Sequence, residues 1–143
     1  MQRQDCLRAA AAYFDDGRFL ADLQRRVAFR TESDTGAVTP ALGAYLREEM
    51  TPALAELGFH CEVIDNPAPG GGPFLIARRI EGPELPTVLS YGHGDVVSGQ
   101  DAQWRDGLGP WTLTVEGERW YGRGTADNKG QHSINLGALA QAI

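Results

Sequence analysis

The sequence predicts an α/β protein in which a layered sheet is flanked by helices. Apolar residues recur at helical spacing up to Gly58, and short alternating or apolar runs typical of strands occupy the middle of the chain. A further helical pattern begins at Lys129. Helices therefore flank the strands along the chain, which is the pattern of a layered α/β domain.

The first part of the chain contains the expected helices. Two are expected within 5–30, separated by the turn signal Asp-Asp-Gly at 15–17. The polar, glycine-containing segment 31–39 is expected to be a loop. A Thr-Pro pair then opens a helix over 39–58, because Pro is favoured at the first helical position. Pro52 is expected to kink this helix, since it lacks the N–H that the helix requires.

The strands are expected in the middle of the chain, with breaker-rich residues 66–73 forming a loop. They are 59–64, 74–80 and 86–91, followed by a hairpin of 111–115 and 119–121. The apolar pair Val88 and Leu89 predicts that 86–91 is buried within the sheet. The helix that begins at Lys129 is expected to bury the apolar stripe Leu136, Leu139, Ala140 and Ile143.

Size and composition indicate one globular domain and exclude several classes of function. The 143 residues are 42% hydrophobic and 22% charged, typical of globular proteins. The chain has 13 Lys and Arg residues but 19 Asp and Glu residues. It therefore lacks the excess of positive charge that neutralises nucleic-acid phosphates, and no nucleic-acid partner is expected. No apolar run approaches the roughly 18 residues of a membrane span, so no membrane partner is expected. Cys6 and Cys61 are too few for a disulfide framework, and a cytoplasmic location is expected.

Three glycine-rich stretches do not fit nucleotide binding. Residues 70–72 lie between prolines with no following helix, and 92–94 lack the third glycine of a dinucleotide fingerprint. In 122–127, Asp127 stands where that fingerprint requires glycine, and its carboxylate would repel a pyrophosphate. Nucleotide binding is therefore disfavoured.

His93 and Asp95 form a candidate site directly after the expected strand 86–91. Residues two apart on extended backbone point the same way, so the carboxylate can fix the imidazole as it does for metal-binding histidines. Loops at the carboxyl ends of strands are also where ligands bind in open α/β sheets. The residues alone leave open that His93 is a turn histidine and Asp95 an ordinary loop carboxylate.

Asp127 is the second candidate, at the start of the expected last helix. Free backbone donors there can orient a carboxylate that also bridges cations. The alternative is that Asp127 only caps this helix and that Lys129, the one lysine of the chain, is a solvated residue of its first turn.

Together, these clusters resemble the co-catalytic zinc metallopeptidase family of aminoacylase, acetylornithine deacetylase, succinyl-diaminopimelate desuccinylase, carboxypeptidase G and carnosinase. The matching residues span about 40 positions in the family's order and spacing. They are 91–97 (Tyr-Gly-His-Gly-Asp-Val-Val), Trp104, 109–111 (Gly-Pro-Trp) and 120–130 (Trp-Tyr-Gly-Arg-Gly-Thr-Ala-Asp-Asn-Lys-Gly). The resemblance implies that 1–143 begins a zinc-exopeptidase-like catalytic domain.

The resemblance also implies roles for three residues. His93 would ligate one metal ion, Asp127 would bridge two, and Asp95 would be the acidic catalytic residue that orients His93. The complete site would hold two Zn²⁺ ions, with Co²⁺ or Mn²⁺ as substitutes. The family's general base belongs to a Glu-Glu pair after the bridging Asp, whereas the pair at 48–49 precedes His93.

Other features indicate that residues 1–143 are the N-terminal portion of a longer catalytic domain. His60 and His132 lack the family's context and are interpreted as surface or core histidines. Two metal contacts, from His93 and Asp127, are fewer than a zinc site requires. The stripe of the last helix also continues to Ile143 without a stop signal. The rest of the domain and a dimerisation domain are therefore expected to be absent.

The expected function is hydrolysis of an amide C–N bond in a small peptide or N-acyl amino acid by a water that two metal ions activate. This chain alone is expected to be inactive, and the full-length protein to be a homodimer. One alternative is a non-catalytic fragment or scaffolding module that keeps the fold. Another is a mononuclear or carboxylate-only hydrolase in which Asp95 and Asp127 serve as acid and base.

Overall fold

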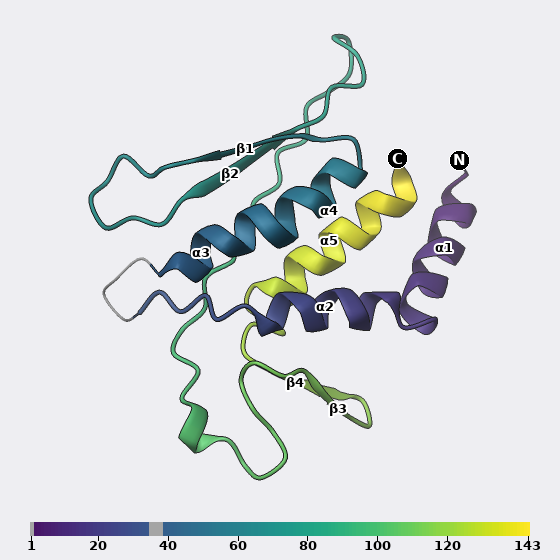
Figure 1. Ribbon diagram of the computed structural model, residues 1–143. Helices are drawn as coiled ribbons and strands as arrows, with labels where there is room; N and C mark the ends of the chain where they lie inside the picture. The colour runs from purple at the N-terminus through teal and green to yellow at the C-terminus, as the bar shows by residue number, and fades with distance from the viewer. Residues whose placement is uncertain (1, 35–38) are drawn as a thin grey trace.

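The computed structural model describes residues 2–34 and 39–143, and its mixture of helices and strands confirms the α/β class (Figure 1). The helices are α1 (Arg3–Asp15), α2 (Arg18–Ala28), α3 (Pro40–Ala44), α4 (Thr51–Glu56) and α5 (Lys129–Ala142). The strands are β1 (His60–Ile64), β2 (Phe74–Arg78), β3 (Thr114–Glu116) and β4 (Arg119–Tyr121). A π-helical turn, Tyr45–Met50, joins α3 to α4, and a short 3₁₀ turn covers Asp101–Gln103. Residues 35–38 of the expected 31–39 loop lie outside the described residues.

The helices form a layer between two hairpins (Figure 1). In this layer α5 packs against α1 and α2, and the π-helical turn also contacts α2. The β1–β2 hairpin follows α4 and packs beside it. The β3–β4 hairpin lies on the other side of α2, where Leu113 joins Leu23 and Val27 in a buried apolar cluster. This arrangement places the start of α5 at the centre of the molecule.

The expected helix boundaries are confirmed, and each has a local cause. Gly17 separates α1 from α2 in the left-handed conformation that glycine adopts at little cost (φ 84°). Gly58 ends α4 in the same conformation (φ 80°). The helix expected over 39–58 is divided by the π-helical turn, which ends at Met50, and Pro52 lies in the first turn of α4. Pro52 has no N–H to donate, and the Leu46 carbonyl at the π-helical turn accepts from both the backbone N–H and the hydroxyl of Thr51, the latter at 2.8 Å.

The predicted hairpin of 111–115 and 119–121 is present, and the strands predicted over 59–64 and 74–80 also pair with each other. β1 and β2 pair antiparallel from His60 opposite Arg78 to Ile64 opposite Phe74. β3 and β4 pair from Thr114 opposite Tyr121. Both pairings are local in sequence, which is why alternation and turn residues predict them.

The predicted strand over 86–91 is wrong. This segment is extended but unpaired, and the side chains of Val88, Leu89 and Tyr91 are 88%, 94% and 83% exposed. Within the described residues β1 and β2 pair only with each other, so the segment finds no neighbouring strand. The apolar run predicts burial, but burial of a strand depends on partners elsewhere in the chain.

The buried face of α5 also differs from the expected apolar stripe. Of that stripe only Leu136 is buried, and Ile143 is 45% exposed. The buried residues of α5 are Lys129, Gly130, His132, Ser133, Leu136 and Gly137. At Gly137 an added Cβ would lie 2.6 Å from the Tyr13 ring, so the helix approaches α1 too closely for a larger side chain. Helix α5 therefore packs through small and polar residues.

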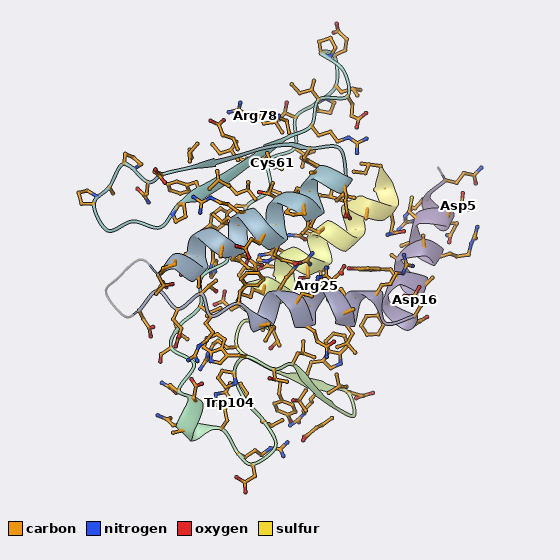
Figure 2. All side chains as sticks on the ribbon, viewed as in Figure 1. Asp5, Asp16, Arg25, Cys61, Arg78 and Trp104 are labelled. Carbon is orange, nitrogen blue, oxygen red and sulfur yellow. The ribbon has the colours of Figure 1, made fainter. Side chains whose placement is uncertain are left out.

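An ion pair is buried where α2, the π-helical turn and α5 meet. Arg26 and Glu49 are 2% and 8% exposed, and the Arg26 Nε donates to Glu49 Oε1 at 3.1 Å. The Arg26 Nη1 donates to the Ser133 hydroxyl at 2.7 Å, which itself donates to the Lys129 carbonyl at 2.6 Å. Arg25, on the side of α2 that faces the other helices, also reaches Glu49 at 3.3 Å (Figure 2). These bonds connect three elements that are distant in sequence.

A second buried polar group surrounds Tyr45. The Tyr45 hydroxyl contacts Nε2 of His132, and Lys129 Nζ donates to the Phe29 carbonyl at 2.6 Å. Lys129 is fully buried, so the alternative of a solvated first-turn lysine is wrong. Burial lowers the pKa of Lys129 to about 7. Burial, together with the positive charge of Arg26, lowers the pKa of His132 to about 4.

Replacing Glu49 by Ala should lower the free energy of unfolding by about 3–5 kcal/mol, because the Arg26 guanidinium then stays buried without its carboxylate. Urea denaturation followed by circular dichroism measures this. Glu48→Ala is the matched control, since Glu48 is the exposed neighbour on the same turn. Equal losses in the two variants would contradict the buried ion pair.

His132 should make the fold sensitive to acid. Its folded pKa lies below the ordinary value, so between pH 6.5 and 4 the unfolded chain binds a proton that the folded chain does not. Stability should therefore fall by about 3 kcal/mol over this window, and His132→Gln should remove that part of the loss. His60→Gln, at an exposed position, should leave the acid profile of unfolding unchanged. Parallel profiles for wild type and His132→Gln would contradict the burial of His132.

Candidate metal centre

His93 follows the extended segment 86–91, and its imidazole lies between two carboxylates. Nδ1 is 3.0 Å from Asp95 Oδ1 and 3.2 Å from the Asp95 carbonyl oxygen. Nε2 is 3.0 Å from Oδ1 of Asp127. The sequence-predicted pairing of His93 with Asp95 is therefore present, and the second ring nitrogen is directed toward Asp127.

Asp95 is itself held by a residue that sequence reasoning missed. The Ser33 hydroxyl donates to Asp95 Oδ2 at 2.7 Å. A parallel β-bridge between Glu32 and Val96 places the segment that contains Ser33 beside the segment that contains Asp95. The Ser33 N–H donates to the Val96 carbonyl at 3.0 Å. Ser33 lies 62 residues before Asp95, so no local pattern could reveal the contact. With one oxygen bonded to Ser33, Asp95 directs its other oxygen to His93.

Asp127 directly precedes α5 and turns its carboxylate to His93 rather than to the helix. The residue at the N-cap position is Asn128, and no side chain caps the helix there. The alternative in which Asp127 only caps the helix is therefore wrong. The peptide bond from Asp127 to Asn128 is cis. The Asp127 side chain is 85% exposed, which leaves its carboxylate accessible from solvent.

Asn128 connects the two segments that carry His93 and Asp127. Its Oδ1 accepts a hydrogen bond from the backbone N–H of His93 at 3.1 Å, and its Nδ2 donates to Gln131. Because Asn128 follows Asp127 directly, this bond limits the separation between the two candidate ligands. The position of Asn128 inside the 120–130 motif was the only sequence signal for it.

The remaining motif residues support the loop that follows Asp95. The Trp104 indole donates to the Gly99 carbonyl at 2.7 Å, and the Arg123 guanidinium lies 5.9 Å from the Trp104 ring centroid. The Arg123 N–H donates to the Pro110 carbonyl at 2.7 Å. Trp104 lies in the loop that contains the 3₁₀ turn, at the lower end of the molecule in Figure 2. These residues are part of the scaffold of the site.

Other candidate ligands lie away from this cluster. His60 is exposed on β1, and His132 is buried beside Tyr45, in agreement with their interpretation as surface and core histidines. Glu49 of the Glu-Glu pair is bonded to Arg26. Cys6 and Cys61 are both free thiols, the second on β1 (Figure 2).

The donor pair suits a zinc ion. Typical Zn–N and Zn–O distances near 2.1 Å and a tetrahedral angle require the two donor atoms to be roughly 3.4 Å apart. The observed 3.0 Å between His93 Nε2 and Asp127 Oδ1 needs only a small side-chain adjustment. Within residues 2–34 and 39–143, however, no three His, Cys, Asp or Glu side chains gather as one metal-binding group. The described part of the chain supplies two donors and the Asp95 carboxylate behind one of them.

Among the residues that the structure describes, no helix has the length and apolar character to cross a membrane.

Comparisons with known proteins find similarity over the segment that carries these residues. The model of peptidase family M20/M25/M40 matches residues 89–143, which include His93, Asp95 and Asp127. Beta-Ala-His dipeptidase of Mus musculus is 40% identical over 125 residues, which are 78% of this chain and 24% of that protein. Acetylornithine deacetylase of Pectobacterium carotovorum is 43% identical over 88 residues, 60% of this chain and 21% of that protein.

The fold is also that of a solved dipeptidase. The structure of Dug1p from Saccharomyces cerevisiae superposes with a TM-score of 0.76 at 20% identity, covering 96% of this chain and 30% of that chain. This chain therefore spans about a quarter of the length of the relatives that it matches. The family model, the relatives and the fold agree: this chain is similar to members of peptidase family M20/M25/M40, and residues 89–143 match that family's model.

Proposed function

We propose that this chain carries one half of the active site of a metal-dependent hydrolase that cleaves the amide C–N bond of a dipeptide or an N-acyl amino acid. The observation that carries the proposal is the line of three side chains, Asp95, His93 and Asp127, joined through the two ring nitrogens of His93. The named relatives, a Beta-Ala-His dipeptidase and an acetylornithine deacetylase, support this class of substrate.

In this proposal His93 Nε2 and the Asp127 carboxylate would hold Zn²⁺, with Co²⁺ or Mn²⁺ as substitutes. When bound, two such ions supply an activated water and polarise the substrate carbonyl. Asp95 accepts from His93 Nδ1, which fixes the ring and directs the lone pair of Nε2 to the metal. Asp127 is exposed, so its second oxygen is free to face a second ion.

We also propose that residues 1–143 are the N-terminal portion of the metallopeptidase catalytic domain. The support is that the described residues offer two metal donors, whereas a catalytic zinc site uses three protein ligands. The matches cover only 24% and 21% of the two relatives' own length. The general base, the remaining ligands and a dimerisation domain would then come from outside these residues. A cytoplasmic location and a homodimer belong to the same proposal.

The presence of only two metal donors in the described residues also supports a second candidate function. In it, the chain is a non-catalytic module that keeps the fold without a working site. A carboxylate-only hydrolase is less well supported, because Asp95 and Asp127 bind the same imidazole from opposite sides. An acid and a base that act on one substrate need to face that substrate together.

Zinc titration by calorimetry tests the proposed ligands. The chain should bind Zn²⁺ weakly, because two donors leave most of the coordination to water. His93→Ala should remove most of the affinity, and Asp95→Asn should lower it about 10–100-fold through the lost support of the ring. His60→Ala is the matched control at an exposed histidine and should change nothing. Unchanged zinc binding in His93→Ala, or two tight sites on this chain, would contradict the proposal.

Hydrolysis assays with β-Ala-His and N-acetylornithine separate the candidate functions. On a protein that contains this chain and the rest of the domain, hydrolysis that a chelator abolishes and stoichiometric zinc are expected. Absence of zinc and of hydrolysis would favour the scaffolding module. Hydrolysis that resists the chelator would favour the carboxylate-only reaction.

A further inference from the structure

The backbone on both sides of His93 rests directly on two buried side chains. A Cβ added to Gly94 would lie 2.5 Å from Cε1 of Tyr45, closer than real Cβ atoms approach. A Cβ added to Gly92 would lie 3.2 Å from Cβ of His132. Tyr45 and His132 therefore form a floor beneath the turn that presents His93, in contact with its backbone.

Both side chains of this floor are buried and in contact with their neighbours. Tyr45 is 1% exposed and packs edge-on against Phe29, with ring centroids 5.5 Å apart. The Lys129 Nζ lies 5.0 Å from the centroid of the Tyr45 ring, and the Tyr45 hydroxyl contacts Nε2 of His132. The backbone N–H of His132 donates to the Asn128 carbonyl at 3.1 Å. The floor is thus joined to the start of α5, which follows the ligand candidate Asp127.

The turn around His93 is held from the other sides as well. The backbone N–H of His93 donates to Asn128, and the Gly94 carbonyl accepts from the Thr31 hydroxyl at 2.5 Å. With the backbone held in this way, the imidazole retains only its side-chain torsions, and Asp95 restricts those through Nδ1.

A purely apolar floor would fill the same space at lower cost. Burying a phenol and an imidazole is unfavourable unless the two polar groups pair with correct geometry. The Tyr45 hydroxyl is paired with His132 Nε2, and a directional contact fixes the two rings relative to each other in a way that apolar packing does not. A fixed arrangement of these two rings is consistent with a need to hold the turn around His93 in one position.

We propose that Tyr45 and His132 are positioning residues that set the direction of the His93 imidazole and its distance to Asp127. The inference rests on the proposed role of His93 as a metal ligand. Neither side chain is a ligand in this proposal. They act through Gly92 and Gly94, which they contact.

The test compares four variants by their zinc affinity, measured by calorimetry, and by the ¹H–¹⁵N NMR signals of the His93 ring without metal. Tyr45→Phe and His132→Leu should each lower zinc affinity about tenfold or more, as loss of support to a ligand does. Their His93 ring signals should shift and broaden. His132→Gln should retain most of the affinity, because its amide can still meet the Tyr45 hydroxyl.

Leu136→Ala is the control for simple destabilisation. Leu136 belongs to the same buried cluster as Tyr45 and lies one turn beyond His132 on α5. It should lower the melting temperature and leave both the zinc affinity and the His93 ring signals unchanged. Equal losses of zinc affinity in Leu136→Ala and His132→Leu would overturn the proposal.

The two inferences fail in different ways. A wild-type chain that binds no zinc overturns the proposed function, whereas the His93 ring signals are recorded without metal and still decide the role of the floor. Ring signals that stay unchanged in Tyr45→Phe and His132→Leu overturn the positioning role, whatever the zinc titration gives.

Discussion

The anchoring of the first turn of α5 determines where both candidate ligands lie. Lys129 extends inward to the Phe29 carbonyl at the end of α2, and Ser133 joins the buried pair of Arg26 and Glu49. Asp127 stands immediately before this turn, so its position follows from the anchor. The position of His93 also depends on this anchor, because the His93 backbone N–H donates to the Asn128 side chain. The rest of the site depends on this one junction of three helical elements.

The chemistry of that junction is polar, which affects its specificity more than its stability. Buried ion pairs and buried lysines are costly unless every partner is in place. An apolar junction of the same volume would hold the helices together but would tolerate small shifts between them. Hydrogen bonds from Arg26 to Glu49 and Ser133 tolerate such shifts poorly. The two donors lie 3.0 Å apart and must stay close to the roughly 3.4 Å that a zinc ion requires, so the site benefits from that restriction.

Sequence reasoning predicted what is local and missed what is not. Helix ends at Gly17 and Gly58 and both hairpins follow from nearby residues. The strand predicted over 86–91 was wrong because a strand's burial depends on partners elsewhere in the chain. The apolar stripe of α5 was wrong because small and polar residues, which a hydrophobic pattern does not count, form its buried face.

The same division applies to the site. The pairing of His93 with Asp95 follows from their spacing of two, whereas the approach of Asp127 was expected only from the family resemblance. Ser33 and Tyr45 could not be found from the sequence, because their contacts to the site cross long stretches of chain. Ser33 bonds to Asp95, Tyr45 contacts the turn that carries His93, and neither is a ligand candidate itself.

The meeting of His93 and Asp127 at one metal ion is the central claim, and anomalous diffraction at the zinc absorption edge tests it most directly. A crystal of the chain soaked in Zn²⁺ should show an anomalous peak about 2.0–2.2 Å from both His93 Nε2 and an Asp127 carboxylate oxygen. A peak at His60 or at the cysteines, with none between His93 and Asp127, would contradict it.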